Sequence, residues 1–334
     1  MIEIKNCPSS LHEGLDTYSR KASKLLFGAT KVSPILEFNI DEFRNTGRIV
    51  EAMHRISVSG VQEKFPAVVD NGMISIAQDG ERSTHILKPA PWDKTLRDRK
   101  QIPANEHLTM QIASQVYGIR TASNGLCFTP DGQAVYITRR FDILPDGNKI
   151  PMEDFASLVG RNEQLAGKQF KYHGCYEDIA KAIRSNVAAW MVDMEQFFTL
   201  VVFNYIYANG DAHFKNFSLI LDGQDYRLAP AYDLLNTSLH VDGDDLGLDG
   251  GLSQVIEKSD VYDRTGHPCR LDFEKFATKI GLVNMRVNKI LDRFMTLPDE
   301  ARQLIDRSYL TEKMKRNYLR IVNERISRFV RTSG

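Results

Sequence analysis

The chain lacks most of the features that assign a sequence to a class of protein at first sight. Its longest apolar runs fall well short of the roughly 18 residues that are needed to span a bilayer. The N-terminus also lacks a basic stretch followed by an apolar one, which is the pattern of a secretory signal peptide. We therefore expect a cytoplasmic protein that has no membrane partner.

Cysteine is scarce, with four residues among 334, and no two of them form a CxxC pair or accompany paired histidines. These absences argue against a disulfide framework and against a structural zinc site. We expect free thiols at all four positions, which are Cys7, Cys127, Cys175 and Cys269.

An excess of one charge is missing too, because 43 basic residues balance 43 acidic ones. A polybasic surface for nucleic acid or anionic lipid is therefore not expected, and bulk charge identifies no partner. The content of 42% hydrophobic and 26% charged residues is ordinary for a globular protein. The length suffices for two domains or for two lobes of one domain.

The first 141 residues are predicted to form mainly strands. Apolar residues alternate on both sides of Asn71-Gly72, a pair that favours the positive φ of a hairpin turn. A short apolar strand then ends at Lys88, before a proline. Helical spacing over 105–119 places Glu106 in the first turn of a helix. A second hairpin is expected to turn at Pro130-Asp131-Gly132.

Beyond residue 142 the sequence is predicted to be mainly helical. A helix is expected over 176–187, and a long buried one follows over 188–210, whose apolar residues recur at three- and four-residue steps. The fold class is thus α+β, with a small β-rich lobe at 1–141 and a larger helical lobe at 142–334. We expect a mobile loop at 159–174, near the substrate cleft, and another at 242–251, which lacks the closing glutamate of an EF-hand calcium loop.

The most specific motif comes directly after the long helix. Asp211 and Asn216 stand five positions apart, and Asp233 follows the next predicted strand. The D-x-x-x-x-N spacing equals that of the protein-kinase catalytic loop. It predicts Asp211 as the base at an acceptor hydroxyl, with Asn216 and Asp233 as the ligands of Mg²⁺. The alternative is that Asp211 and Asn216 cap a turn, which is common for these residue types.

Four upstream features support the kinase interpretation. The small-residue turn at Ser59-Gly60-Val61 could hold phosphate oxygens with its backbone amides. Lys88 on a strand and Glu106 on the next helix repeat the lysine–glutamate pair of kinases. Arg139-Arg140-Phe141 lies where the two lobes meet, and its backbone could hydrogen-bond adenine as a hinge does. The order of these features predicts an enzyme that uses ATP and Mg²⁺.

At these residues the sequence strongly resembles the HipA family of bacterial serine/threonine kinases, which are the toxins of toxin–antitoxin systems. The matching stretches are RISVSGVQEK, HILKP, NEH, RRFD, EDF, GDAHFKNFSL and YRLAPAYDLLNT, in family order over about residues 55 to 240. The resemblance implies a bilobed, kinase-like fold with Asp211 as proton acceptor. It places ATP contacts on Ser59, Gly60, Val61, Gln62, Glu63, Lys64, Lys88, Arg139, Arg140, Phe141, His213, Phe214, Lys215, Asn216, Tyr232 and Asp233.

The Ser57-Val58-Ser59 arrangement looks most like the short HipT branch of the family, which implies autophosphorylation at Ser57 and Ser59. Residues 1–54 are also too short for the N-terminal subdomain of long HipA proteins. The resemblance therefore implies a helix-turn-helix antitoxin of the HipB type and a separate small HipS-like protein as partners. DNA would be contacted only through the antitoxin. The implied substrate is an aminoacyl-tRNA synthetase, with the tryptophanyl enzyme favoured.

Two other functions are compatible with the same residues. The stretch from Gly210 to Asn216 also resembles phosphatidylinositol-type lipid kinases, although no basic amphipathic helix for a membrane surface is evident. A catalytically silent corepressor module that only binds its antitoxin is the other alternative, and the complete set of polar residues disfavours it.

Overall fold

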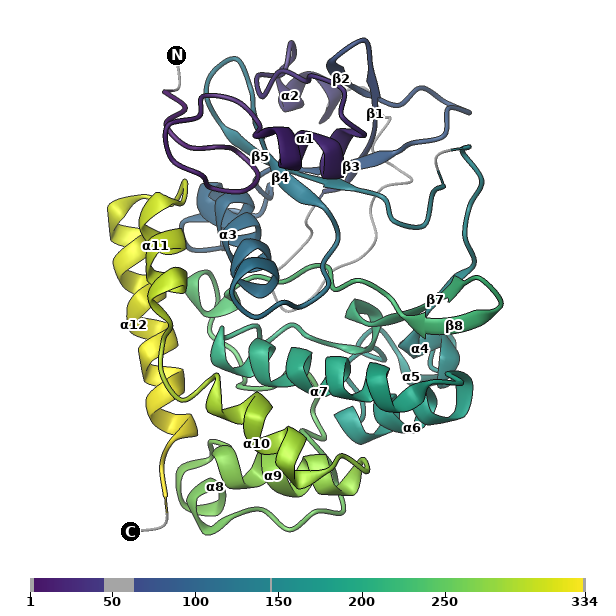
Figure 1. Cartoon of the computed structure of the whole chain (residues 1–334), viewed down its shortest axis with the longest axis vertical. Helices are drawn as coiled ribbons and strands as arrows, with labels where there is room; N and C mark the ends of the chain where they lie inside the picture. The colour runs from purple at the N-terminus through teal and green to yellow at the C-terminus, as the bar shows by residue number, and fades with distance from the viewer. Residues whose placement is uncertain (1–2, 45–62, 145, 333–334) are drawn as a thin grey trace.

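The computed structural model describes residues 3–44, 63–144 and 146–332. It has a β-rich lobe and a helical lobe, as the sequence predicts (Figure 1). The first lobe contains an antiparallel sheet with the strand order β2-β1-β3-β5-β4. Its strands are β1 (Phe65–Asp70), β2 (Met73–Ile76), β3 (His85–Lys88), β4 (Asn124–Phe128) and β5 (Ala134–Arg139). Its helices are α1 (Arg20–Phe27), α2 (Ile40–Arg44) and α3 (Ile102–Gln115).

Turn chemistry and alternation explain this sheet. Asn71 and Gly72 both have positive φ, at 48° and 81°, and they join β1 to β2 as the Asn-Gly pair predicts. Side chains of β4 and β5 alternate between the two faces of the sheet. Cys127 and Ile137 belong to a small core beside α1, whereas Tyr136 joins the main core of the molecule.

Helix α3 begins earlier than the sequence predicts. The spacing indicated a start near Asn105, but the helix starts at Ile102, after a short 3-10 turn. Pro103 fits in the first turn because its missing N–H has no helical partner there. Glu106 consequently lies in the second turn and not in the first. The helix packs against β4, β5 and α11, and nearly all of its residues are buried.

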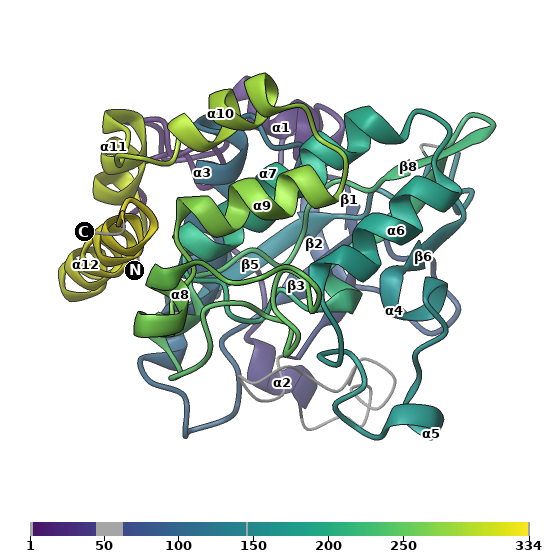
Figure 2. The ribbon, with the colours of Figure 1, turned by 90° about the horizontal axis from the view of Figure 1, so that it is seen from below.

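The helical lobe is built around α7 (Trp190–Ile206), which is mostly apolar and lies across the middle of the lobe (Figure 1). Viewed from below, α9 and α10 lie in front of α7, and the sheet of the other lobe lies behind it (Figure 2). The other helices are α4 (Phe155–Leu158), α5 (Glu163–Ala166), α6 (Tyr176–Asn186), α8 (Asp260–Thr265), α9 (Arg270–Lys279), α10 (Asn284–Asp292), α11 (Asp299–Arg307) and α12 (Glu312–Phe329). A small sheet is formed by β6 (Met152–Asp154), β7 (Ser218–Asp222) and β8 (Asp225–Leu228).

One hydrophobic core extends through both lobes. It includes Leu108 of α3 and Tyr136 of β5 together with Phe203 of α7 and Tyr318 of α12. Helices α11 and α12 stand along one side of the molecule, where α11 contacts α3 and α12 contacts α7. The division after residue 141 that the sequence suggests therefore separates two kinds of secondary structure that share one core.

Two further sequence expectations can be compared with the structure. All four cysteines are buried free thiols, as predicted. Within the described ranges, no helix is long and apolar enough to cross a membrane. The segment 242–251 has neither helix nor strand, whereas 159–174, which was expected to be a mobile loop, contains α5 and forms contacts with the site described below.

The hydrogen bonds between Asp193 of α7 and strand β8 provide a test of how α7 packs against the small sheet. Asp193 is fully buried, and its carboxylate accepts hydrogen bonds from the Arg227 guanidinium, at 2.8 Å, and from the Leu228 amide, at 3.3 Å. Asp193→Ala should lower the free energy of unfolding by about 2–4 kcal/mol, because both donors lose their acceptor. Urea unfolding measures this. Asp225→Ala removes an exposed aspartate of the same hairpin and should change the free energy of unfolding by less than about 0.5 kcal/mol. Equal urea midpoints for the two variants would contradict a stabilising role of the Asp193 carboxylate.

Candidate active site

Three segments that are distant in sequence meet in a buried ion network. Lys88, at the end of β3, forms an ion pair with Glu106 of α3, with Nζ 2.5 Å from Oε1. The same ammonium group pairs with Asp233, and Lys64 also reaches Asp233, at 3.2 Å. The side chains of Lys88 and Glu106 are 3% and 1% exposed. The network thus joins the sheet and α3 of one lobe to the segment after β8 of the other.

The network controls the charge of its members. Burial alone would raise the pKa of Asp233, but the ammonium groups of Lys64 and Lys88 more than offset it and hold the pKa well below its usual range. Burial would lower the pKa of Lys88, but Asp233 and Glu106 raise it above its ordinary value. Asp233 is therefore ionised and Lys88 is charged at neutral pH. Asp233 also has a φ of 57°, a left-handed conformation that aspartate tolerates and that is common at functional sites.

Asp211 lies close to this network, in a loop after α7. It is 8% exposed, so its side chain is buried. The Tyr172 hydroxyl donates a hydrogen bond to Asp211 Oδ1 at 2.9 Å. The preceding Gly210 leaves no space for a side chain, because an added Cβ would lie 2.7 Å from the Asp244 carbonyl oxygen. Its amide donates to Thr237 Oγ1 at 2.9 Å.

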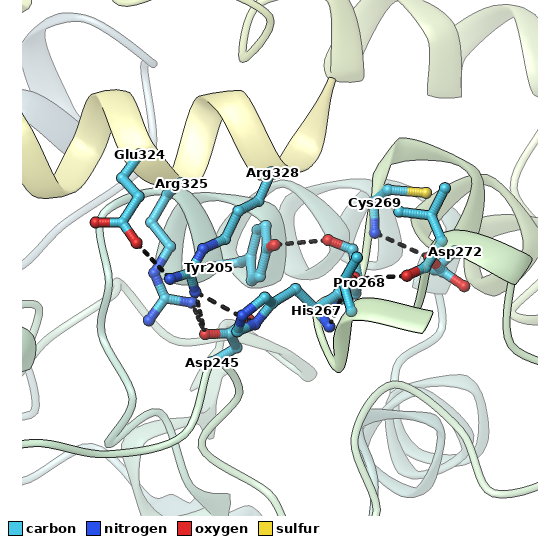
Figure 3. A network of polar contacts seen from close by, with 11 residues as sticks. Tyr205, Asp245, His267, Pro268, Cys269, Asp272, Glu324, Arg325 and Arg328 are labelled. Atoms are coloured by element: carbon cyan, nitrogen blue, oxygen red, sulfur yellow. Dashed lines mark hydrogen bonds and ion pairs between the residues drawn. The ribbon is translucent and has the colours of Figure 1, made fainter. Parts of the chain in front are cut away.

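The loop at 242–251 packs against the loop that contains Asp211. A Cβ on Gly247 would lie 2.5 Å from the backbone nitrogen of Ala212, so the two loops are in direct backbone contact. Asp245 in turn anchors this loop to the C-terminal helix (Figure 3). It forms ion pairs with Arg325 and Arg328 of α12, the latter at 3.1 Å, and contacts His267 at 2.7 Å.

Asn216 fits the role of a metal ligand. It ends the 3-10 turn Phe214–Asn216, and its Oδ1 is buried without a hydrogen-bond partner among the described residues. An amide oxygen of this kind, together with the ionised carboxylate of Asp233, is a suitable donor set for Mg²⁺. Both Asp233 oxygens are engaged by lysines in this structure, so one of those contacts would have to give way to a metal.

A cleft of about 500 Å³ brings these groups together. It is of the size of a small-ligand site, and its apolar walls include Ile86, Ala122 and Met152. The rings of Phe141 and Tyr232 lie 5.9 Å apart at one side. The residues singled out from the sequence that line it are Lys64, Lys88, Glu106, Arg139, Arg140, Phe141, Asp211, His213, Lys215, Asn216, Tyr232 and Asp233.

Other members of the sequence-derived set do not line this cleft. Phe214 is fully buried beneath the guanidinium of Arg161, 4.3 Å from its ring centroid, so its side chain serves the core and not a ligand. Glu63 is buried outside the cleft lining. The remaining residues, which are Ser57, Ser59, Gly60, Val61 and Gln62, lie outside the described residues.

The hinge differs from the sequence expectation in its backbone. The amide of Arg139 donates to Ser123, at 2.8 Å, and that of Arg140 donates to Thr84, at 2.9 Å. These two amides therefore form hydrogen bonds within the first lobe and are not directed to adenine. The guanidinium of Arg140 pairs with Asp142 at 2.7 Å.

Two residues that the sequence analysis missed complete the site. Lys171 lines the cleft, and Tyr172 holds Asp211. Both belong to 159–174, where the aromatic and basic run Phe170-Lys171-Tyr172 within a polar segment was the available signal. His213 lies edge-on to Tyr172, and burial, helped by the charge of Lys171, lowers the pKa of His213 to about 3, so the imidazole is neutral.

The ion network makes a prediction about stability. Lys88→Met should lower the free energy of unfolding by about 3–5 kcal/mol, because it leaves the carboxylates of Glu106 and Asp233 facing each other without their shared cation. Lys64→Met, at a partly exposed lysine of the same network, should cost less than about 1 kcal/mol. Chemical unfolding of both variants measures the difference, and a Lys88→Met protein as stable as Lys64→Met would contradict the role of Lys88.

With this geometry established, comparisons with known proteins identify relatives. The HipA-like C-terminal domain model matches residues 56–301. A putative kinase of Sinorhizobium fredii, Y4mE, is 30% identical over 56% of this chain, and the match covers 44% of that protein. A putative kinase of Haemophilus influenzae is 24% identical over 91% of this chain and 90% of its own length. The serine/threonine-protein kinase toxin HipA of Shewanella oneidensis is 25% identical over 56% of this chain and 45% of its own length. The chain thus spans less than half the length of some curated relatives and nearly all of another.

Solved structures share the fold. HipA from the Shewanella oneidensis complex of HipA, HipB and operator DNA superposes with a TM-score of 0.63 at 19% identity, covering 83% of this chain and 65% of that one. The Helicobacter pylori proinflammatory kinase CtkA gives a TM-score of 0.51 at 16% identity, covering 79% of this chain and 93% of that one. Because the family model covers well over half of the sequence, this chain belongs to the HipA-like C-terminal domain family.

Proposed function

We propose that this protein is an ATP-dependent serine/threonine protein kinase. The observation that carries the proposal is the placement of Asp211, the unpartnered Oδ1 of Asn216 and the Lys88–Glu106–Asp233 network around one cleft. A protein kinase needs a base at the acceptor hydroxyl, oxygen ligands for a metal, and a lysine held by a glutamate. In this chain these groups come from several separate segments, and the fold brings them together.

Each group has a distinct role in this proposal. Asp211 accepts the proton of a serine or threonine hydroxyl, and Tyr172 keeps its carboxylate oriented. Lys88, fixed by Glu106, contacts the phosphates of ATP. Asn216 and Asp233 would hold Mg²⁺, which supplies charge neutralisation on the phosphate oxygens. Phe141, Tyr232 and the apolar wall of the cleft provide a site for the adenine ring.

The biological role that we infer is that of a toxin in a bacterial toxin–antitoxin system. One relative is a HipA toxin kinase, and a structural neighbour was solved with HipB and operator DNA, which supports a helix-turn-helix antitoxin as partner. In this proposal the kinase contacts DNA only through that antitoxin. The proposed substrate is an aminoacyl-tRNA synthetase, tryptophanyl above all, and the proposed second partner is a HipS-like protein. Both rest only on the resemblance to the HipT branch, which the Ser57-Val58-Ser59 arrangement and the short stretch 1–54 suggest.

Asp211→Asn tests the assigned base. The amide keeps the size of the side chain and can still accept the Tyr172 hydrogen bond, but it cannot take up a proton. Phosphoryl transfer from ATP should fall by at least about 1,000-fold, since general-base catalysis and acceptor positioning are both lost. Transfer is measured with radiolabelled ATP and Mg²⁺ on the purified full chain. The exposed Asp222→Asn is the matched control and should retain wild-type activity, and retained activity in Asp211→Asn would exclude this base.

Autophosphorylation supplies a second test. After incubation of the wild-type chain with ATP and Mg²⁺, phosphosite mass spectrometry should find phosphate on Ser57 and Ser59. A dianionic phosphoserine close to the phosphates of ATP should repel them, so the modified protein should lose ATP affinity. Asp211→Asn should carry no phosphate at either serine. Absence of phosphate from both serines of the active wild-type protein would remove autophosphorylation from the account.

A further inference from the structure

A buried lysine that the kinase motifs do not include faces the same cleft. Lys171 comes from the segment before α6, and it is 7% exposed. Within the described part of the chain, the Lys171 ammonium group forms no ion pair. It lies over the face of the Tyr172 ring, with Nζ 5.1 Å from the ring centroid. Burying an unpaired ammonium group costs several kcal/mol, so such a cation is retained where an anion binds.

The charges around Lys171 indicate where that anion would lie. Burial lowers the pKa of Lys171, Asp211 and Asp233 raise it in part, and the positive charges of Lys215 and Lys64 lower it further. The ammonium group is therefore within electrostatic reach of both Asp211 and Asp233 but bonded to neither. Lys171 lines the same cleft as Lys64, Lys88 and Lys215, and this cleft is also lined by the proposed base and the proposed metal ligands. In phosphoryl transfer, the transferred group must cross the space between the base and the metal ligands.

Backbone hydrogen bonds join the segment of Lys171 to the loop that follows α7. The Lys171 carbonyl oxygen accepts the Phe214 amide at 3.1 Å, which pairs the two segments directly. The carbonyl of the next residue, Tyr172, accepts the amide of Asp249 at 3.1 Å, and the Tyr172 hydroxyl donates to Asp211. The catalytic loop itself supplies no buried cation, because His213 is neutral and Lys215 is exposed.

We propose that Lys171 binds the γ-phosphoryl group of ATP and stabilises the negative charge that it carries during transfer. This inference rests on the proposed kinase function. In the step, the acceptor oxygen forms a bond to the γ-phosphorus while the bond from that phosphorus to the bridging oxygen breaks. The proton of the hydroxyl passes to Asp211, and ADP leaves with the bridging oxygen. Lys171 remains a cation throughout and exchanges no proton.

The test separates the γ-phosphate from the rest of the nucleotide. Binding of ADP and of the non-hydrolysable analogue AMP-PNP, both with Mg²⁺, is measured by calorimetry for the full wild-type chain and for Lys171→Met. The variant should bind AMP-PNP about tenfold more weakly while its ADP affinity stays unchanged, because only AMP-PNP has the γ-phosphoryl group. Phosphoryl transfer from ATP should fall by about 100-fold. Lys171→Arg, which keeps the charge, should recover part of both losses.

Lys168→Met is the matched control, since Lys168 is an exposed lysine of the same segment, and it should behave as wild type in both measurements. An equal loss of ADP and AMP-PNP affinity in Lys171→Met would mean that the lysine only supports the fold, which would contradict the proposal. Unchanged AMP-PNP affinity together with unchanged phosphoryl transfer would contradict it as well. If the wild type binds both nucleotides but transfers no phosphate, the kinase proposal fails, whereas the comparison of ADP with AMP-PNP still decides the role of Lys171.

Discussion

The buried ion network of Lys88, Glu106 and Asp233 is the constraint on which the rest of the site depends. Lys88 is nearly inaccessible to solvent, so it must be satisfied by carboxylates, and these come from α3 and from the segment after β8. That requirement fixes the sheet of one lobe against the segment after β8 of the other. The continuous core of α3, α7, α11 and α12 then holds the lobes in this arrangement.

The network also explains why the proposed nucleotide site would need no excess of positive charge over the whole chain. Within it, two lysines balance two carboxylates, and Lys171 and Lys215 also line the cleft. The 43 acidic and 43 basic residues of the whole chain therefore say little about its ligand. Local placement, and not bulk composition, sets the electrostatics of the site.

Local sequence patterns predicted those parts of the fold and site that depend on neighbours in sequence. The Asn71-Gly72 pair marked its hairpin because only a few residue types adopt positive φ readily, and the apolar periodicity of 188–210 marked α7. The D-x-x-x-x-N spacing marked Asp211 and Asn216. The start of α3 was placed too late, because the pattern gave too little weight to a proline that is compatible with a first turn.

The parts that the sequence did not reveal depend on contacts between distant residues. Tyr172 and Asp211 are separated by 39 positions, and no periodicity links them. A polar segment with glycines at 160, 167 and 174 suggested a mobile loop near the cleft, but not the hydrogen bonds that it accepts from the amides of Phe214 and Asp249. Phe214 belongs to the motif by position, but packing against Arg161 directs its side chain into the core.

Our central proposal is that Asn216 and Asp233 hold a metal-bound nucleotide in the cleft that Lys88 lines. A crystal structure of the full chain with AMP-PNP and Mg²⁺ tests it most directly. In this complex we expect Asn216 Oδ1 and the Asp233 carboxylate to coordinate the metal. We also expect Lys64 to be no longer paired with Asp233, and Lys88 to contact the phosphates. A nucleotide bound outside the cleft, or a metal ion that touches neither Asn216 nor Asp233, would contradict it.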